Sequence, residues 1–259
     1  MREESESMEK QLYKVLKTGM TVFLLVMAYF LPGICLEMTA RPEAAGGERQ
    51  VMAEAGGETE TQAAPRKTIV LDPGHGGEDP GMVGIGGVEE KGINLQVALA
   101  LKTLLEEQGY SVVLTRNDDN GLYDAGSANK KAQDMQRRCA LIEAEDPVLT
   151  VSIHQNSYTD PAVYGPQVFY FEHSEEGRIL ASCIQEALNT GLEIKKPRAV
   201  KANTNYYILK RSASVTVLVE CAFLSNPDEA EKIGTEEYRE ALARAICEGI
   251  LEYCTLRSQ

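Results

Sequence analysis

The segment Thr68–Gly81, TIVLDPGHGGEDPG, contains the features that decide the fold. Its apolar start, IVL at 69–71, is typical of a buried strand, and the run stops at an Asp-Pro pair. A glycine-flanked histidine, His75, follows in a chain that has only 3 histidines. The segment therefore predicts a buried strand that leads a histidine into a glycine-rich loop. By itself it leaves open whether that histidine is functional or merely exposed in a turn.

Helical and strand patterns alternate along the rest of the chain. Apolar residues recur at spacings of three and four in four segments, 93–105, 132–145, 175–192 and 235–253. Short apolar or β-branched runs between them predict further strands at 111–115, 148–153, 167–171 and 215–219. This alternation predicts an α/β fold, a single domain with a mostly parallel central sheet flanked by helices.

The amino-terminal part has a different composition. Three lysines precede an apolar run, Gly19–Leu36, which is typical of an export signal or an uncleaved signal anchor. Residues 37–66 are rich in Ala, Glu and Gly, so we expect a flexible linker. The predicted organisation is a signal or signal-anchor segment at 1–36, the linker at 37–66 and a catalytic domain at 67–259. We expect an exported protein, either secreted or anchored in the membrane through its apolar segment.

Charge and cysteine content exclude some functions. The net charge of −13 and the pI of about 4.8 argue against binding of nucleic acid, which relies on cationic contacts to phosphate. The 6 cysteines include no C-x-x-C pair, and with Cys35 in the apolar run an odd number remains for the domain. Free thiols are therefore expected rather than a disulfide framework.

Three predicted strands end in a polar residue that could take part in chemistry, namely His75, His154 and Glu220. The carboxyl ends of parallel strands lie along one edge of a sheet, where ligands bind in such folds. A fourth residue, Glu90, begins the first predicted helix. Two histidines and a glutamate are a ligand set that binds catalytic zinc and leaves one position open for water. A second carboxylate nearby would then act as the general base.

Four segments resemble the motifs of the zinc-dependent N-acetylmuramoyl-L-alanine amidases of the type 3 family. They are LDPGHGGEDPG at 71–81, EEKGINL at 89–95, SIHQNS at 152–157 and VECAFLSNPDE at 219–229. The resemblance implies that His75, Glu90 and His154 bind Zn²⁺. It also implies that Glu220 is the catalytic acid and base. It selects Glu90 over its neighbour Glu89, which we expect to be a solvated charge at the helix start.

Further segments resemble the sporulation branch of the family, whose members are similar to germination-specific, cortex-modifying amidases. They are DDNGLYD at 118–124, NKKAQDM at 129–135, QVFYF at 167–171 and NTNYYILK at 203–210. This resemblance implies hydrolysis of peptidoglycan in the spore cortex, on the way to muramic-δ-lactam. It also implies an accessory protein, because some relatives need one. Ala222 stands where the family commonly has glycine, which affects the local backbone geometry.

Other candidate residues have competing interpretations. Asn156 could bind substrate or cap a turn, and the sequence does not favour either. Cys221 is a poor candidate nucleophile because it has no predicted paired base. His173, in the segment EHSEEG, is expected at the surface. The alternative functions are a non-catalytic peptidoglycan-binding wall protein and a zinc peptidase that acts on the stem peptide.

Overall fold

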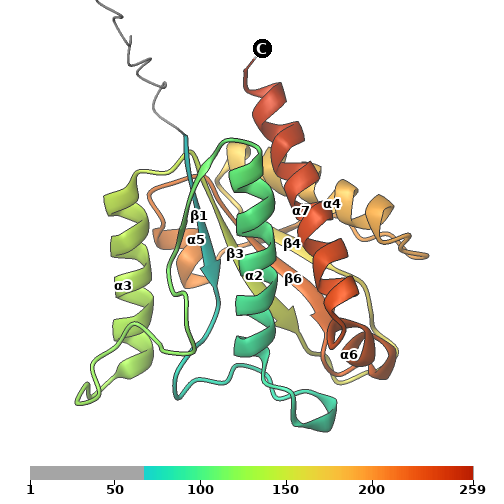
Figure 1. Ribbon diagram of the computed structural model, residues 1–259, viewed down its shortest axis with the longest axis horizontal. Coiled ribbons are helices and arrows are strands. Elements are labelled where there is room, and N and C mark those ends of the chain that lie inside the picture. Colours follow the sequence, from blue (N-terminus) through green and yellow to red (C-terminus); the bar gives the residue numbers. More distant parts are fainter. Residues whose placement is uncertain (1–66, 259) are drawn as a thin grey trace, which may run out of the picture. The chain divides into compact units, whose positions relative to one another are not determined.

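The computed structural model describes residues 67–258, and the predicted signal segment and linker lie outside the described residues. The described part is an α/β fold built on a six-stranded sheet in the order β2-β1-β3-β6-β4-β5. In that order the strands are β2 (Ser111–Leu114), β1 (Thr68–Pro73), β3 (Leu149–Asn156), β6 (Thr216–Phe223), β4 (Gln167–Phe171) and β5 (Lys201–Asn203). The predicted fold class is confirmed (Figure 1).

All neighbouring strands in the sheet are parallel except β4 and β6, which run antiparallel. The connection between β3 and β4, residues 157–166, contains no helix. A chain returning to the opposite edge for a parallel strand needs a crossover of about a dozen residues or more, usually helical. The short connection therefore leaves β4 to run back from the edge at which β3 ends.

Helices cover both faces of the sheet (Figure 1). One face is covered by α2 (Glu90–Glu107), α4 (Glu175–Gly191) and α7 (Glu236–Leu256), which pack on one another and on the larger apolar core. The other face carries α3 (Lys130–Glu145) and the short α5 (Tyr207–Arg211) over a smaller apolar cluster. The short α6 (Pro227–Ile233) follows β6, and no helix in residues 67–258 is long and apolar enough to cross a membrane.

Side-chain alternation along the strands places polar residues on the face that α3 and α5 cover. In β3, Val151 and Ile153 belong to the larger core, so Ser152 and His154 project to the opposite face. In β6, Val219 is likewise in the larger core and Glu220 faces the other way. The polar side chains of neighbouring strands therefore meet on the face with the smaller helical cover.

The structure differs from the sequence prediction in where some elements begin and end. Only His75 follows its strand, whereas His154 lies inside β3 and Glu220 lies inside β6. Pairing between β3 and β6 continues beyond these residues through a register shift, or β-bulge, between His154 and Asn156. The prediction that three strands end at these residues is therefore wrong for two of them. The short elements α5, β5 and the 3₁₀ turn Ile85–Gly87 were not predicted.

Candidate metal centre and active site

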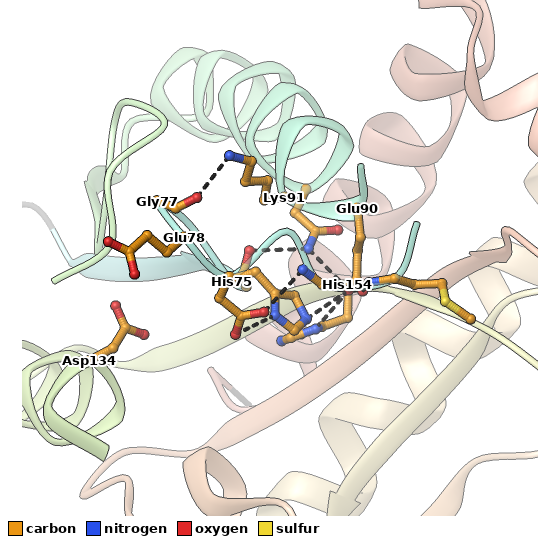
Figure 2. A network of polar contacts seen from close by, with 12 residues as sticks. His75, Gly77, Glu78, Glu90, Lys91, Asp134 and His154 are labelled. Atoms are coloured by element: carbon orange, nitrogen blue, oxygen red, sulfur yellow. Dashed lines mark hydrogen bonds and ion pairs between the residues drawn. The ribbon is translucent and has the colours of Figure 1, made fainter. Parts of the chain in front are cut away.

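His75, Glu90 and His154 form a compact cluster at the carboxyl-terminal edge of the sheet (Figure 2). One carboxylate oxygen, Oε1 of Glu90, lies 3.0 Å from Nδ1 of His154 and 3.3 Å from Nε2 of His75. One donor atom from each residue lies within 4.8 Å of the others. The structure thus brings together three residues from a loop, a helix and a strand.

Glu90 is a buried carboxylate at the first turn of α2. Its Oε1 accepts hydrogen bonds from the backbone N–H of Gln155 and from the side-chain amide of Asn94, and its Oε2 accepts one from the N–H of Met82. Burial alone would raise the pKa of Glu90, but the hydrogen bonds and charges of the two histidines hold that pKa far below its usual range. The helix amino terminus also favours a negative charge. Glu90 is therefore held as a carboxylate.

His75 lies in the loop after β1 with a left-handed backbone, φ 65°. Its Nδ1 lies 3.0 Å from Oδ2 of Asp79, which leaves Nε2 facing Glu90. Partial burial would lower the pKa of His75, but the Glu90 and Asp79 carboxylates raise it above its ordinary value. A carboxylate that binds one ring nitrogen fixes the tautomer and the orientation of a histidine at a metal site. Asp79 therefore fixes which nitrogen His75 presents.

Gly74 allows the two histidines to approach each other. A Cβ atom at this position would lie 2.2 Å from Cε1 of the His154 ring, which is inside the ring's van der Waals surface. The ring centroids of His75 and His154 are 5.0 Å apart, in an edge-to-face arrangement. The glycine before His75 is therefore required by a close contact across the cluster.

Glu220 lies beside the cluster, on the strand next to that of His154. Its side chain is buried, and its Oε1 lies 3.4 Å from the hydroxyl of Tyr206. Its Oε2 has no hydrogen-bond partner among the described residues. Burial, reinforced by the charge of Glu90, raises the pKa of Glu220 above its ordinary value. A buried carboxyl group with a raised pKa and an unpartnered oxygen is suited to accept and donate a proton.

The cluster and Glu220 line one cavity of about 710 Å³. Its lining comes from the glycine-rich loop, the amino-terminal half of α3, α5 and the end of β3. Asn156 lines the cavity, and its Oδ1 also accepts a hydrogen bond from the backbone N–H of Ser157. The two interpretations of Asn156, substrate contact and turn cap, are therefore compatible.

The donor set fits a zinc ion. Zinc–nitrogen and zinc–oxygen bonds of about 2.1 Å in a tetrahedral arrangement place neighbouring ligand atoms roughly 3.4 Å apart. The separations from Glu90 Oε1 to the two histidine nitrogens, 3.0 Å and 3.3 Å, are close to this spacing. Two imidazoles and one carboxylate also match the ligand types of catalytic zinc sites. The three residues can therefore hold a metal ion.

The remaining candidates lie outside this arrangement. Glu89 is half-exposed and pairs with Lys91, and His173 is exposed, as expected for both. Cys221 is fully buried in the larger core, where burial raises the pKa of its thiol well above its ordinary value. It does not line the cavity. A buried, protonated thiol on the far face of the sheet is unsuited to nucleophilic attack.

Comparison with known proteins gives a clear match. The family model described as N-acetylmuramoyl-L-alanine amidase matches residues 69–252. The chain belongs to this amidase family. The germination-specific N-acetylmuramoyl-L-alanine amidase of Bacillus subtilis is 38% identical over 192 residues, which cover 73% of this chain and 80% of that protein. The chain is therefore a peptidoglycan hydrolase of the amidase class, which argues against both a non-catalytic wall protein and a zinc peptidase.

Solved structures agree with this assignment. The CwlD amidase of Clostridioides difficile, solved in complex with the GerS lipoprotein, matches with a TM-score of 0.72 and 37% identity, over 74% of this amidase and 100% of that chain. The amidase AmiC2 of Nostoc punctiforme matches with a TM-score of 0.65 and 29% identity, over 74% and 99% of the two chains. The described domain is thus similar to complete amidase chains in these structures.

Sequence reasoning missed three residues that support the centre: Asp79, Arg116 and Arg138. Asp79 could have been noticed as a carboxylate four residues after His75 in the same loop. Arg116 follows a predicted strand, which is where the fold argument expects functional side chains. Arg138 lies on the apolar face of the helix predicted at 132–145, where a charged residue requires a buried partner. Its partners are Asp72 and Asp134.

Proposed function

We propose that this amidase is a zinc enzyme of the spore cortex, with His75, Glu90 and His154 as the metal ligands and Glu220 as the catalytic acid and base. The observation that carries the proposal is that Glu220, a buried carboxyl group whose Oε2 has no partner among the described residues, lines the same cavity as the three-residue cluster. Zinc held there would polarise the scissile carbonyl and activate water at neutral pH.

The protein's own groups would carry the proton transfers. Oε2 of Glu220 takes a proton from the attacking water and then delivers it to the amide nitrogen of the leaving L-alanine. Its raised pKa supports both steps, because a general base that is also a general acid works best near the operating pH. Asp79 holds the Nδ1 side of His75, and Asn156 contacts the substrate from the cavity wall.

The spore cortex is proposed as the site of action because of the relatives. The germination-specific amidase of Bacillus subtilis is similar over most of this chain. Cleavage would leave muramic acid residues without a stem peptide, which is the chemistry needed before muramic-δ-lactam forms. The basic flank and apolar run at the amino terminus support export, with the catalytic domain outside the cytoplasmic membrane.

An accessory protein is part of the same proposal. The CwlD amidase was solved in complex with a lipoprotein, and it is similar to the whole described domain. We therefore propose that a lipoprotein of the same compartment assists this amidase. Purification of the tagged amidase from sporulating cells, followed by assays with and without any co-purified lipoprotein, tests this part.

One experiment tests the central proposal. The full chain is incubated with purified spore cortex and with vegetative peptidoglycan, with and without a chelator, and the fragments are identified by mass spectrometry. We expect release of intact stem peptides with free amino-terminal L-alanine, loss of release with chelator and recovery on addition of zinc. Cleavage inside the stem peptide, or undiminished cleavage after complete removal of metal, would contradict the proposal.

A further inference from the structure

Arg116 is a buried arginine with no carboxylate partner within ion-pair distance among residues 67–258. Only 5% of it is exposed, and every hydrogen bond that it donates goes to a backbone carbonyl. Burying a cation without a counter-charge is costly unless its donors are satisfied. Four hydrogen bonds to backbone carbonyls take the place of an ion pair here. The role of Arg116 can therefore be inferred from the backbone segments that it binds.

The four carbonyls come from three separate segments. Nε binds the carbonyl of Pro73 at 2.9 Å, and Nη2 binds that of Gly74 at 2.9 Å, so two bonds reach the residues before His75. Nη2 also binds the carbonyl of Lys91 at 2.7 Å, directly after Glu90. Nη1 binds the carbonyl of Asp118 at 2.8 Å, in the loop that covers the glycine-rich segment.

Nη2 of Arg116 thus bonds both Gly74, which precedes the candidate ligand His75, and Lys91, which follows the candidate ligand Glu90. The His75 loop has a left-handed backbone, and no regular sheet pairing extends beyond Pro73 to hold it. Glu90 lies in the first turn of α2, whose N–H groups have no partner within the helix. Those of Glu90 and Lys91 bond the carbonyls of Met82 and Pro80, which ties the turn to the end of the glycine-rich loop. The side chains of Asn94 and Lys91, which belong to α2, also reach the His75 loop, at the carbonyls of Gly74 and Gly77. Arg116 differs from them because it bonds the backbone of both segments from outside either one.

We propose that Arg116 is a positioning residue that sets the separation of His75 and Glu90, and that its main effect is on metal affinity. The inference rests on the proposed metal-binding role of these two residues. Binding sites need their groups held within about 0.5 Å of the productive geometry, so a displaced ligand weakens the site. Loss of groups that orient metal ligands typically weakens metal binding about 10- to 100-fold.

Lysine cannot replace this function. The guanidinium group presents its donors in a rigid planar fork, so it can reach carbonyls that lie in different directions. An ammonium group has its three donors on one atom and would bond at most part of the set. Arg116→Lys therefore keeps the charge and most of the volume but loses the bridge between the two ligand segments.

Arg198 provides a matched control. Its Nε binds the carbonyl of Tyr164, its Nη1 binds the side chain of Gln167, and its guanidinium lies 5.0 Å from the Phe223 ring centroid. It touches neither the cluster nor the segments that Arg116 joins. Arg198→Lys therefore removes a comparable set of arginine contacts elsewhere in the fold.

The test uses the full chain as wild type, Arg116→Lys, Arg116→Gln and Arg198→Lys. Zinc dissociation constants are measured by competition with a chromophoric chelator, and unfolding midpoints are measured with and without zinc. We expect a dissociation constant about 10- to 100-fold higher in both Arg116 variants and a smaller zinc-induced rise in their midpoints. Arg198→Lys should bind zinc like the wild type.

Two results would overturn the inference while leaving the proposed function intact. One is unchanged zinc affinity in a folded Arg116 variant, and the other is failure of both variants to fold in excess zinc. The second result would assign Arg116 to the general stability of the domain. Absence of zinc binding by the wild type would contradict the proposed function itself, and the inference with it.

Discussion

His154 and Glu220 are register partners on the neighbouring parallel strands β3 and β6. Side chains at partnered positions project from the same face of a sheet. The distance between a candidate metal ligand and the candidate proton carrier is therefore set by backbone pairing in the middle of the sheet. Sites built on such rigid elements hold their geometry better than sites built on loops.

Replacing Glu220 with glutamine tests its role as acid and base. The amide keeps the shape of the side chain but cannot carry the proton, so the rate should fall by about 10²- to 10⁴-fold while zinc stays bound. Metal analysis and muropeptide mass spectrometry measure both quantities. Glu229→Gln is the control, because Glu229 is also a buried carboxyl with a raised pKa, but it bonds the N–H groups of Phe223 and Gly165. Near wild-type turnover in Glu220→Gln would show that the assignment is wrong.

Replacing Asp79 with asparagine tests how His75 is oriented. The amide can turn its NH₂ group to Nδ1 of His75 and so favour the tautomer that has its proton on Nε2, the nitrogen facing Glu90. We expect zinc affinity to fall about 10-fold or more, as measured by chelator competition. Asp124→Asn, which changes an exposed ion pair with Arg137, should leave zinc affinity unchanged. Equal affinities in the two variants would exclude an orienting role for Asp79.

Replacing Gly74 with alanine tests the close approach of the histidines. Its Cβ would lie 2.2 Å from the His154 ring, so the ring must move and both metal content and turnover should be lost. Gly92→Ala is the matched change, because a Cβ there meets nothing within 4 Å and the residue lies in α2. That variant should be more stable by up to about 1 kcal/mol. Retention of metal by Gly74→Ala would mean that the loop adjusts freely.

Asp72 predicts a specific acid dependence of stability. Burial alone would raise the pKa of this carboxyl, but Arg138 together with Ser152 and Thr115 lowers it from 3.8 to about 2. A lowered folded-state pKa gives stability that is fully present above about pH 4 and is lost as the pH falls towards 2, amounting to about 2 kcal/mol. Denaturant titrations of the wild type over this range should show that loss. Asp72→Asn, although less stable overall, should show a flatter dependence, and parallel curves would contradict the assignment.

Much of the site could be predicted from the order of strands and helices along the sequence. Parallel strands alternating with helices predict that residues near strand ends meet at one edge, and His75, His154 and Glu220 do meet there. The Asn226-Pro227 pair is a local signal of a helix start, and the Asn226 side chain accepts the N–H of Glu229 at the start of α6. These features depend on local patterns and on one topological rule, and both are visible in a sequence.

Other features depend on contacts between distant residues, which the sequence pattern does not contain. The pairing of β4 with β6 rather than with β3, which precedes it in the chain, is one such feature. The choice of Glu90 over Glu89 came from resemblance, because both are acidic and only the packed helix start buries one of them. The carbonyl contacts of Arg116 join segments that lie up to 43 positions away in the chain.

The unpartnered Oε2 of Glu220 has a consequence for how this domain can change during evolution. A buried polar atom without a partner destabilises a protein by about 1–3 kcal/mol, so the folded domain is weakened at the position proposed for proton transfer. An apolar residue of similar size, as in Glu220→Met, should give an inactive domain that unfolds at a higher temperature. Selection for turnover therefore has to maintain this glutamate, because a variant without it would be more stable but inactive.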